Sequence, residues 1–422
     1  MIQKPRGTMD ILPDEVVYWQ YIEKKARDVA ARYGFGEIRL PTFEVTELFQ
    51  RGVGGTTDVV QKEMYTFQDR DGKSISLRPE GTAGTVRALI ENGKCSDVLP
   101  LKLYYILNCF RHEKPQAGRY REFFQFGVEM FGAGAAAADA SVISLANTLL
   151  TELGVKNIHL HINSIGCPVC RPQFQKKLRE YLELHRGELC QTCQGRLDTN
   201  PLRVLDCKNP ECRAIAEKAP KTIEHLCPEC ASHFSALQEY LQAEGIRFEV
   251  DSGIVRGLDY YTRTVFEFIA PVVGAQSTVC GGGRYDGLMQ ELGGPALPGI
   301  GFGMGINRLI LAMQGCGIHL EPDDQPLLYI ASMGHAASVR ASAITETLRR
   351  TGVHAECDLA ERSLKAQMKY ANKLGARYTL ILGDQELETG TAQLKNMETG
   401  EQLAVRFDAD GELFAALGVS RS

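Results

Sequence analysis

Long apolar runs, an excess of cations and a signal-like N-terminus are all missing from this sequence of 422 residues. No stretch of 18 uncharged apolar residues occurs, which excludes a helical membrane span. Residues 1–6 lead into no apolar segment of the kind that a secretory signal has. Lys and Arg number 47 against 52 Asp and Glu, so the net charge of −5 excludes a histone-like polybasic protein. The sequence therefore predicts a soluble cytoplasmic protein that does not act at a membrane.

Neither of the two common phosphate-binding loops is present. Residues 71–74 (DGKS) resemble the end of a P-loop, but Phe67 stands where that motif requires its first glycine. Residues 299–305 alternate as GxGxGxG, which differs from the GxGxxG of dinucleotide-binding folds. Any nucleotide site must therefore be built from side chains, above all from arginines, whose guanidinium groups bind phosphate oxygens in pairs.

Glycine and cysteine, in contrast, are plentiful, with 42 and 13 residues. Eight of the cysteines form three CxxC pairs and one CxxxxC pair, namely Cys167/Cys170, Cys190/Cys193, Cys207/Cys212 and Cys227/Cys230. In a reducing compartment such pairs indicate metal ligands, because a two-residue gap lets both sulfurs reach one tetrahedral ion. We expect one or two structural zinc ions. The alternative is a small insertion whose reduced cysteines need no metal.

The order of strand-like and helix-like patterns indicates three regions. Residues 1–165 alternate short strands with helices, the cysteine-rich block follows at about 167–247, and a linker at 317–326 precedes a smaller α/β region. Apolar spacing predicts a helix over 14–33 and another that ends at Arg350. The predicted strands cover residues 37–41, 74–77, 103–107, 264–268, 327–330 and 378–382.

Two arginine-containing segments indicate contact with a polyanion. Residues 110–121 (FRHEKPQAGRYR) follow a buried strand and are typical of a cationic hairpin tip, and residues 301–308 (GFGMGINR) place Arg308 at the start of an apolar helix. Taken alone, the first could be a solvated surface and the second a packing requirement for glycine. Together and in this order, they resemble motifs 2 and 3 of class II aminoacyl-tRNA synthetases.

Three further blocks resemble the histidyl-tRNA synthetase family in particular: residues 77–84 (LRPEGTAG), residues 256–267 (RGLDYYTRTVFE) and the glycine run at 281–287. The resemblance implies a mixed α/β protein, in which an α+β catalytic domain with a class II antiparallel sheet covers residues 1–322. A cysteine-rich insertion at 167–247 would interrupt it, and residues 326–422 would form an α/β anticodon-binding domain. Pro41 matches the family's dimer motif, which implies a homodimer. Cysteines in the insertion are a feature of only some members, so the zinc prediction rests on their spacing.

The resemblance implies a histidine–tRNA ligase that uses L-histidine, ATP with Mg²⁺, and tRNA(His). Arg111 and Arg256 would flank the α-phosphate as the catalytic cations, and Arg308 would hold the β/γ end and stack on adenine. Glu113 would lie beside the adenine edge, with Phe123 on the other face of the ring.

The histidine pocket is expected to hold carboxylates and hydroxyl groups. Glu80, Thr82 and Gln125 match the amine-binding positions of the family, and Glu129 and Tyr261 match the positions that bind the imidazole nitrogens. The pocket wall would be completed by Tyr260 and Tyr285. One departure is visible, because Asn307 replaces the acidic residue that usually precedes the motif 3 arginine. We expect it to alter the orientation of Arg308 at most.

Cations in two places are expected to contact tRNA. Arg119 and Arg121 lie in the predicted hairpin tip, and a helix over 362–377 carries five further cations on one face: Arg362, Lys365, Lys369, Lys373 and Arg377. A second face of this helix holds Leu364, Met368, Ala371 and Leu374, so it can pack inward. Residues 326–422 hold 11 basic and 12 acidic side chains, and this concentration of cations favours a phosphate track over a merely solvated face.

Two other functions are compatible with parts of the sequence. An inactive histidine-sensing paralogue, like the regulatory subunit of ATP phosphoribosyltransferase, would share the catalytic fold. Such a protein typically lacks the anticodon-binding part and the three activation arginines, which are all present here. A zinc-ribbon nucleic-acid module would explain only the segment from Cys167 to Cys230.

Overall fold

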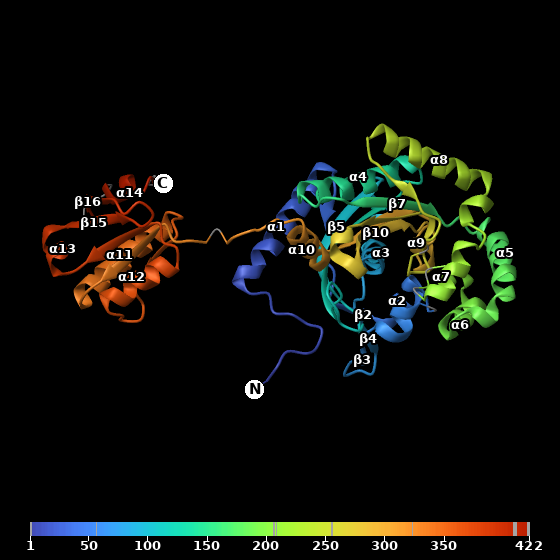
Figure 1. The fold of residues 1–422 in the computed structure, drawn as a ribbon, viewed down its shortest axis with the longest axis horizontal. Helices are drawn as coiled ribbons and strands as arrows, with labels where there is room; N and C mark the ends of the chain where they lie inside the picture. The colour runs from blue at the N-terminus through green and yellow to red at the C-terminus, as the bar shows by residue number, and fades with distance from the viewer. Residues whose placement is uncertain are drawn as a thin grey trace. The chain divides into compact units, whose positions relative to one another are not determined.

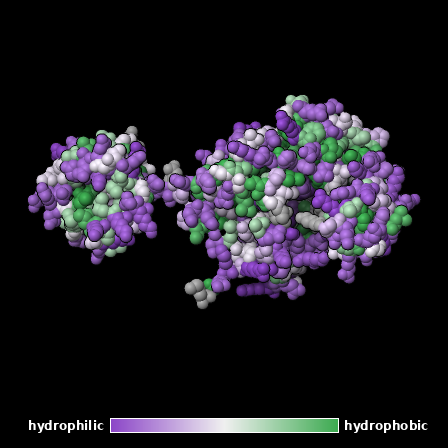
Figure 2. Space-filling view, in the orientation of Figure 1, coloured by the Kyte–Doolittle hydropathy of each residue, from purple (hydrophilic) through white to green (hydrophobic). Residues whose placement is uncertain are grey.

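The protein forms two compact units, Met1–Leu320 and Glu321–Ser422, in a computed structural model. The structure describes residues 2–419 except 56, 206, 208, 255, 323 and 408–411, so one residue of the predicted linker lies outside the described part. Hydrophilic side chains cover most of the visible face of each unit (Figure 2). Within the described part of the chain, no helix is both long and apolar enough to cross a membrane.

An eight-stranded sheet forms the centre of the first unit (Figure 1). Its strands, in spatial order, are β1 (Gly36–Glu37), β5 (Leu101–Phe110), β6 (Glu122–Phe131), β11 (Gly299–Gly305), β10 (Thr278–Arg284), β9 (Thr262–Ile269), β7 (His159–Ser164) and β8 (Glu249–Val250). The six central strands pair antiparallel, and β1 and β8 add to the two edges in parallel. The predicted antiparallel sheet and mixed α/β class are confirmed.

Four helices pack against one face of this sheet and leave the other face for the site. They are α1 (Pro13–Arg32), α4 (Ala136–Glu152), α8 (Pro228–Ala243) and α10 (Ile306–Gly315). The predicted helix over 14–33 is confirmed as α1, which begins with a proline in its first turn followed by two acidic residues, as helix starts favour. On β6, Val128 and Met130 join the core under the helices, while Glu129 lies on the opposite face, as the alternation of a strand requires.

Smaller elements line the rim of the site face. A second sheet consists of β2 (Phe43–Val45), β4 (Ser74–Leu77) and β3 (Thr66–Gln68), and three short helices lie nearby, namely α2 (Thr46–Phe49), α3 (Thr82–Glu91) and α9 (Leu288–Glu291). The strand predicted over 37–41 is wrong in extent, because only Gly36 and Glu37 pair with β5. Beyond them the chain turns away, and the carbonyls of Leu40 and Pro41 accept hydrogen bonds from Arg78 instead.

The cysteine-rich block is inserted between β7 and β8. Helices α5 (Arg171–Leu184), α6 (Gln191–Thr199) and α7 (Pro210–Glu217) form a separate lobe in Figure 1, with 3₁₀ turns at Arg186–Glu188, Pro201–Val204 and Thr222–His225. Phe174, Leu178 and Leu197 belong to a small core of its own. Helix α8 returns the chain to the main core through Phe234, Leu237 and Leu241, so this helix belongs both to the insertion and to the main core of the first unit.

The second unit contains a five-stranded sheet in the order β13 (Ala355–Cys357), β12 (Leu328–Ser332), β14 (Tyr378–Leu382), β15 (Thr391–Asn396) and β16 (Gln402–Arg406). Strand β12 pairs in parallel with both β13 and β14. Helices α11 (His335–Arg350) and α14 (Glu412–Ala416) cover one face, α12 (Leu364–Lys373) covers the other, and α13 (Asp384–Thr389) joins β14 to β15. Because both faces are covered, β12 is buried throughout, which is why residues 328–331 form a continuous apolar run.

Candidate active site

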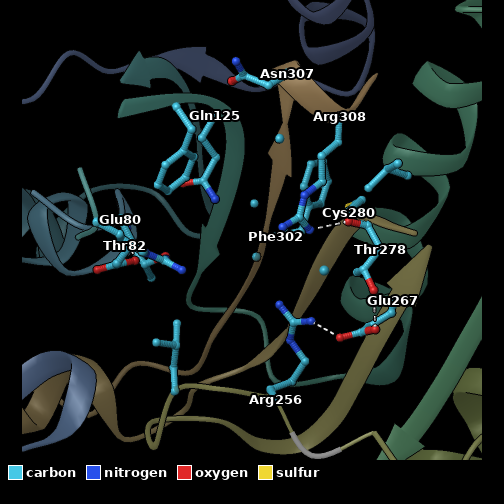
Figure 3. Close-up of a pocket in the computed structure, with 18 of the residues that line it drawn as sticks. Glu80, Thr82, Gln125, Arg256, Glu267, Thr278, Cys280, Phe302, Asn307 and Arg308 are labelled. Carbon is cyan, nitrogen blue, oxygen red and sulfur yellow. Dashed lines mark hydrogen bonds and ion pairs between the residues drawn. The ribbon is translucent and has the colours of Figure 1, made fainter. Parts of the chain in front are cut away.

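A cavity of about 520 Å³ lies on the site face of the eight-stranded sheet (Figure 3). Most of the predicted ligand-binding residues line it: Glu80, Thr82, Arg111, Glu113, Arg119, Phe123, Gln125, Arg256, Tyr260, Tyr261, Tyr285 and Arg308. They come from segments that are up to 228 residues apart, between Glu80 and Arg308. The fold therefore gathers the sequence motifs around one space.

Glycines form the floor of this cavity. A Cβ atom on Gly301 would overlap the Glu129 carboxylate, one on Gly303 would overlap the Gln125 amide, and one on Gly281 would overlap the Arg256 guanidinium. Strand β11 alternates glycine with Ile300, Phe302 and Met304, which belong to the core under the helices. The GxGxGxG pattern therefore forms a strand that has no side chains on one face. Functional groups from neighbouring segments can lie directly on that face of the sheet.

Glu129 is fully buried and is held by three hydroxyl groups. One of its carboxylate oxygens accepts hydrogen bonds from Thr82 Oγ1 at 2.7 Å and Tyr105 Oη at 3.0 Å, and the other accepts from Tyr285. Burial raises the pKa of Glu129 to about 8, although the hydroxyl donors favour its ionised form. Glu129 does not itself line the cavity, but its three hydroxyl partners, Thr82, Tyr105 and Tyr285, do.

Glu80 organises the beginning of α3. Its carboxylate accepts backbone N–H groups of Thr82 at 2.7 Å and Ala83 at 2.8 Å. These groups lack partners within the helix, so the carboxylate stabilises the helix start and turns Thr82 toward Glu129. Burial raises the pKa of Glu80.

Three arginines reach the cavity from three different elements, and each is anchored. Arg111 donates from Nε to the Pro79 carbonyl at 2.9 Å and stacks on Phe123 at 5.3 Å from the ring centre. Arg308 donates to the carbonyls of Gly118 at 2.9 Å and Thr278 at 2.7 Å.

Arg256 forms an ion pair with Glu267, whose other oxygen accepts from Thr278 at 3.0 Å (Figure 3). Burial lowers the pKa of Arg256, but the Glu267 carboxylate outweighs it and raises that pKa above its usual value. The guanidinium groups are therefore fixed before any ligand binds, which is the condition for efficient electrostatic catalysis.

The hairpin tip between β5 and β6 contributes a further ion pair. Glu113 pairs with Arg119, which also lies 3.8 Å from Glu63. Arg121 instead donates to the Glu113 carbonyl at 3.3 Å and does not line the cavity. Asn307 accepts the Phe124 backbone N–H at 2.9 Å, so its side chain ties α10 to β6.

The eight paired cysteines converge into two clusters. One contains Cys167, Cys170, Cys227 and Cys230, and the other contains Cys190, Cys193, Cys207 and Cys212. Within each cluster all four sulfurs lie within 4.8 Å of one another, and the shortest S–S separations are 3.7 to 3.9 Å. A tetrahedral zinc ion with bonds of about 2.3 Å spaces its sulfurs about 3.8 Å apart, so both clusters fit this ion.

Comparison with known proteins identifies the family to which this architecture belongs. A family model described as histidyl-tRNA synthetase matches residues 7–309, and one described as an anticodon-binding domain matches residues 328–414. A histidine–tRNA ligase from Acetivibrio thermocellus is 53% identical over 408 residues, which are 97% of this chain and 98% of the relative. This chain belongs to the histidyl-tRNA synthetase family.

Other members of the family agree closely. A histidine–tRNA ligase from Clostridioides difficile is 49% identical over 407 residues, with coverage of 96% of this chain and 97% of the relative. The crystal structure of apo histidyl-tRNA synthetase from S. aureus superposes with a TM-score of 0.83 and 39% identity, and covers 99% of both chains. The main interpretation of the sequence, an aminoacyl-tRNA synthetase that acts as a histidine–tRNA ligase, is confirmed over the inactive paralogue.

The cationic helix of this synthetase is shorter than predicted. Helix α12 spans only Leu364–Lys373, so Arg362 and Arg377 lie outside it. Arg362 pairs with Asp358 at 2.8 Å and stacks on Tyr370, so its charge is compensated within the unit. The remaining lysines of the predicted stripe, Lys365, Lys369 and Lys373, are exposed. The inward face is as predicted, because Leu364, Met368, Ala371 and Leu374 pack together below the helix.

Sequence reasoning missed two residues at the site of this synthetase. Tyr105 was predicted only as part of a buried strand, but its ring lies between Gly81 and Gly127 and its hydroxyl binds Glu129. The signal was weak, since a tyrosine in an apolar run usually packs in the core. Glu267 ends the RGLDYYTRTVFE block, and its pairing with Arg256 depends on the irregular chain path between them.

Proposed function

We propose that this cavity activates L-histidine with ATP, forms histidyl-adenylate and pyrophosphate, and then transfers histidine to the 3′ end of tRNA(His). The observation that carries the proposal is the polarity of the cavity. In Figure 3, Arg256 and Arg308 lie on one side of the cavity with Glu267 and Thr278, and the polar side chains of Glu80, Thr82 and Gln125 lie across from them. Such a space complements a polyphosphate joined to a small cationic amino acid.

ATP occupies the arginine end in this proposal. Arg111 and Arg256 flank the α-phosphate, and Arg308 binds the β/γ end and stacks on adenine, with Glu113 and Phe123 beside the ring. Because Arg119 pairs with Glu113 at the cavity wall, we assign Arg119 to the ATP side as well, and we leave only Arg121 of the hairpin tip for contact with tRNA.

Histidine occupies the other end, where Glu80, Thr82 and Gln125 receive its amine. Tyr261 and Glu129 bind the imidazole nitrogens, and the wall is formed by Tyr260 and Tyr285. Glu129 reaches the imidazole by exchanging one of its present hydroxyl partners for the ligand. A pocket that bonds both ring nitrogens rejects apolar side chains of similar size by about 10⁴-fold or more.

The activation step needs fixed positive charge more than proton transfer. An oxygen of the histidine carboxylate, already ionised, attacks the α-phosphorus; a new P–O bond forms, the bond to the bridging oxygen breaks, and pyrophosphate leaves. Negative charge is spread over the phosphoryl oxygens in the transition state, where Arg111 and Arg256 stabilise it.

Mg²⁺ enters this proposal together with ATP. Among the described residues, groups of three or more metal-ligating side chains occur only at the cysteines, so the cavity offers no dedicated cage of carboxylates. Mg²⁺ commonly binds through substrate phosphates and one or two carboxylates, and Glu267 faces the cavity to supply one. The ion would neutralise charge on the leaving pyrophosphate.

Each cysteine cluster holds a zinc ion in this proposal, so the chain carries two. Hydrogen bonding from the Cys193 backbone lowers the pKa of Cys190 to about 7, whereas burial raises the pKa of Cys193 and Cys212, so zinc binding would release protons from these thiols. Since four sulfurs close each site, the ions are structural. Free thiols and the tRNA substrate both fit the cytoplasm, where disulfides are rare.

Residues 1–322 act as the catalytic domain with its insertion at 167–247, and residues 326–422 as the anticodon-binding domain. The exposed lysines of α12 then follow the phosphates of the anticodon arm. The chain forms a homodimer through the region of Pro41, where Phe43 and Phe67 are exposed. Arg78 links this region to the site, because it binds the Pro41 carbonyl and is followed by Pro79, the acceptor of Arg111.

Exchange of pyrophosphate into ATP tests the activation step directly. The purified protein should catalyse histidine-dependent exchange without tRNA, whereas a histidine-sensing paralogue would not. Absence of exchange at saturating histidine and ATP would overturn the proposal.

A further inference from the structure

The segment that carries Arg256 has little support from regular structure. Between β8 and β9 the described residues of 251–261 form turns and bends, and Arg256 itself has a left-handed backbone with φ of 61°. A non-glycine residue persists in this conformation only when its surroundings impose it. On one side of the segment, a second cavity of about 690 Å³ separates residues 251–254, 256 and 257 from α7 of the insertion, so packing alone does not impose this conformation there.

Asn163 of β7 donates to the carbonyls of Ser252 and Ile254, before Arg256, and three side chains of the cysteine-rich block hold the part of the segment that follows it. Arg203 donates to the Gly257 carbonyl at 2.7 Å, and Asn200 donates to the Asp259 carboxylate at 3.2 Å. Arg171 donates to the Tyr261 carbonyl at 2.5 Å. Residues 257, 259 and 261, which directly follow Arg256 and include one predicted imidazole ligand, are thus each bonded to the insertion.

The holding side chains are themselves placed by the cysteine clusters. Arg171 directly follows Cys170 of the first cluster. Asn200 and Arg203 lie between Cys193 and Cys207, so the second cluster closes the loop that carries them. Asp58 pairs with Arg196 at 3.0 Å and lies 3.8 Å from Arg203, which adds a tie from this loop to the rim of the site.

We propose that the cysteine-rich insertion acts in amino-acid activation as a positioning device. Its two metal-closed clusters fix Arg171, Asn200 and Arg203, which hold residues 257–261 and thereby aim Arg256. This inference rests on the proposed zinc binding and activation chemistry, and it assigns the insertion a role before tRNA binds. Arg203 is a positioning residue, since it touches the backbone of the segment and does not line the ATP and histidine cavity.

The test compares Arg203→Ala with Arg186→Ala in the full-length, metal-loaded protein. Arg186 is a matched control, because it lies in the same block but its ion pairs, with Glu183 and Asp198, stay within it. Pyrophosphate exchange is measured without tRNA, and zinc per chain is measured by elemental analysis. We expect Arg203→Ala to keep two zinc ions and the KM for histidine but to lose about 10- to 100-fold in kcat, since small misplacements of catalytic groups cost this much. Arg203→Lys, which retains one donor, should recover part of the loss.

A second arm removes metal from one cluster. Cys207→Ser with Cys212→Ser should lower zinc from two to one per chain and reduce kcat in the same way as Arg203→Ala. If this variant does not fold, stepwise chelation of the wild-type protein replaces it, with exchange and zinc followed together.

The outcomes separate this inference from the proposals beneath it. A kcat for Arg203→Ala equal to that of Arg186→Ala overturns the positioning role, as does a loss of kcat that comes only with loss of zinc and of folded structure. Absence of pyrophosphate exchange in the wild-type protein would contradict the proposed activation chemistry itself. Full exchange by zinc-free protein would show that the metal is not needed to position Arg256.

Discussion

The two units of this synthetase use positive charge in opposite ways. In the first unit, Arg111, Arg256 and Arg308 are each bonded to a carbonyl or carboxylate at the cavity, where little water screens them. In the second unit, Lys365, Lys369 and Lys373 are exposed along one helix. Fixed charges in a partly dry cavity can stabilise one transition state strongly, whereas exposed charges bind a long polyanion weakly, additively and with strong dependence on salt.

The largest difference is expected between a buried ion pair of the first unit and an exposed ion pair of the second, in their effects on the free energy of unfolding. Asp139 is fully buried, accepts two hydrogen bonds from buried Arg284 and lies 2.8 Å from His233, so it joins α4, α8 and β10. Asp139→Ala leaves the Arg284 charge without its main partner and should lower the free energy of unfolding by about 3–5 kcal/mol. Glu346 forms an exposed ion pair with Arg350 in the second unit. Glu346→Ala should leave the free energy of unfolding almost unchanged. Equal urea midpoints for both variants would contradict this contrast.

The next effect concerns the chemical step. Arg256→Ala should lower the rate of adenylate formation by roughly a hundredfold or more, about 3 kcal/mol, with little change in histidine affinity. Lys156→Ala, which removes an exposed cation from the same unit, serves as the control. Single-turnover quench measurements check the rate, and an unchanged rate would show that Arg256 has a structural role only.

A smaller effect is expected at the histidine end. Glu129→Gln replaces the carboxyl group, which can become ionised when it binds an imidazole N–H, by an amide that cannot, so histidine should bind about ten- to a hundredfold more weakly. Calorimetric titration measures this affinity. Identical dissociation constants for wild type and variant would remove Glu129 from the histidine site.

The same residue makes stability depend on pH. The folded protein retains a proton on Glu129 up to about pH 8, whereas the unfolded chain loses it near the usual value of 4.5. The stabilisation from this proton is therefore complete below about pH 4.5 and is lost as pH rises toward 8. Thermal unfolding between pH 5 and 9 should show a decline for wild type that is flatter in Glu129→Gln; parallel curves would argue that Glu129 does not retain the proton.

The exposed cations should give the smallest effect for each residue. Replacement of Lys365, Lys369 and Lys373 together by Gln should weaken tRNA binding and reduce the slope of log affinity against log salt by roughly 2 to 3, while pyrophosphate exchange stays intact. Arg350→Gln, in which an exposed cation paired with Glu346 is removed, is the control. Unaltered affinity and slope in the triple variant would mean that the lysines form only a solvated surface.

Local signals predicted much of the fold correctly. Strand β14 has the predicted bounds, and α1 lies within one residue of them at each end, because apolar periodicity and helix-start residues act over a few neighbours. Prediction was weaker where a contact with a residue elsewhere in the structure determined the end of a strand or helix. The strand at 37–41 shortened because its last residues found Arg78, and the cationic helix shortened to Leu364–Lys373 while Arg362 turned to Asp358.

The sequence by itself determined the family, the motifs of the site and the cysteine pairs, since these depend on residue identity and spacing along the chain. Only the tertiary structure decided which cysteine pairs share a cluster: Cys167/Cys170 meets Cys227/Cys230 across an entire helical lobe. The tertiary structure alone also showed that Tyr105 hydrogen-bonds to Glu129, that Glu267 pairs with Arg256, and that Arg203 donates to the Gly257 carbonyl. The physical reason is that such contacts join segments distant in sequence, and their geometry follows from how sheet, helices and insertion pack together.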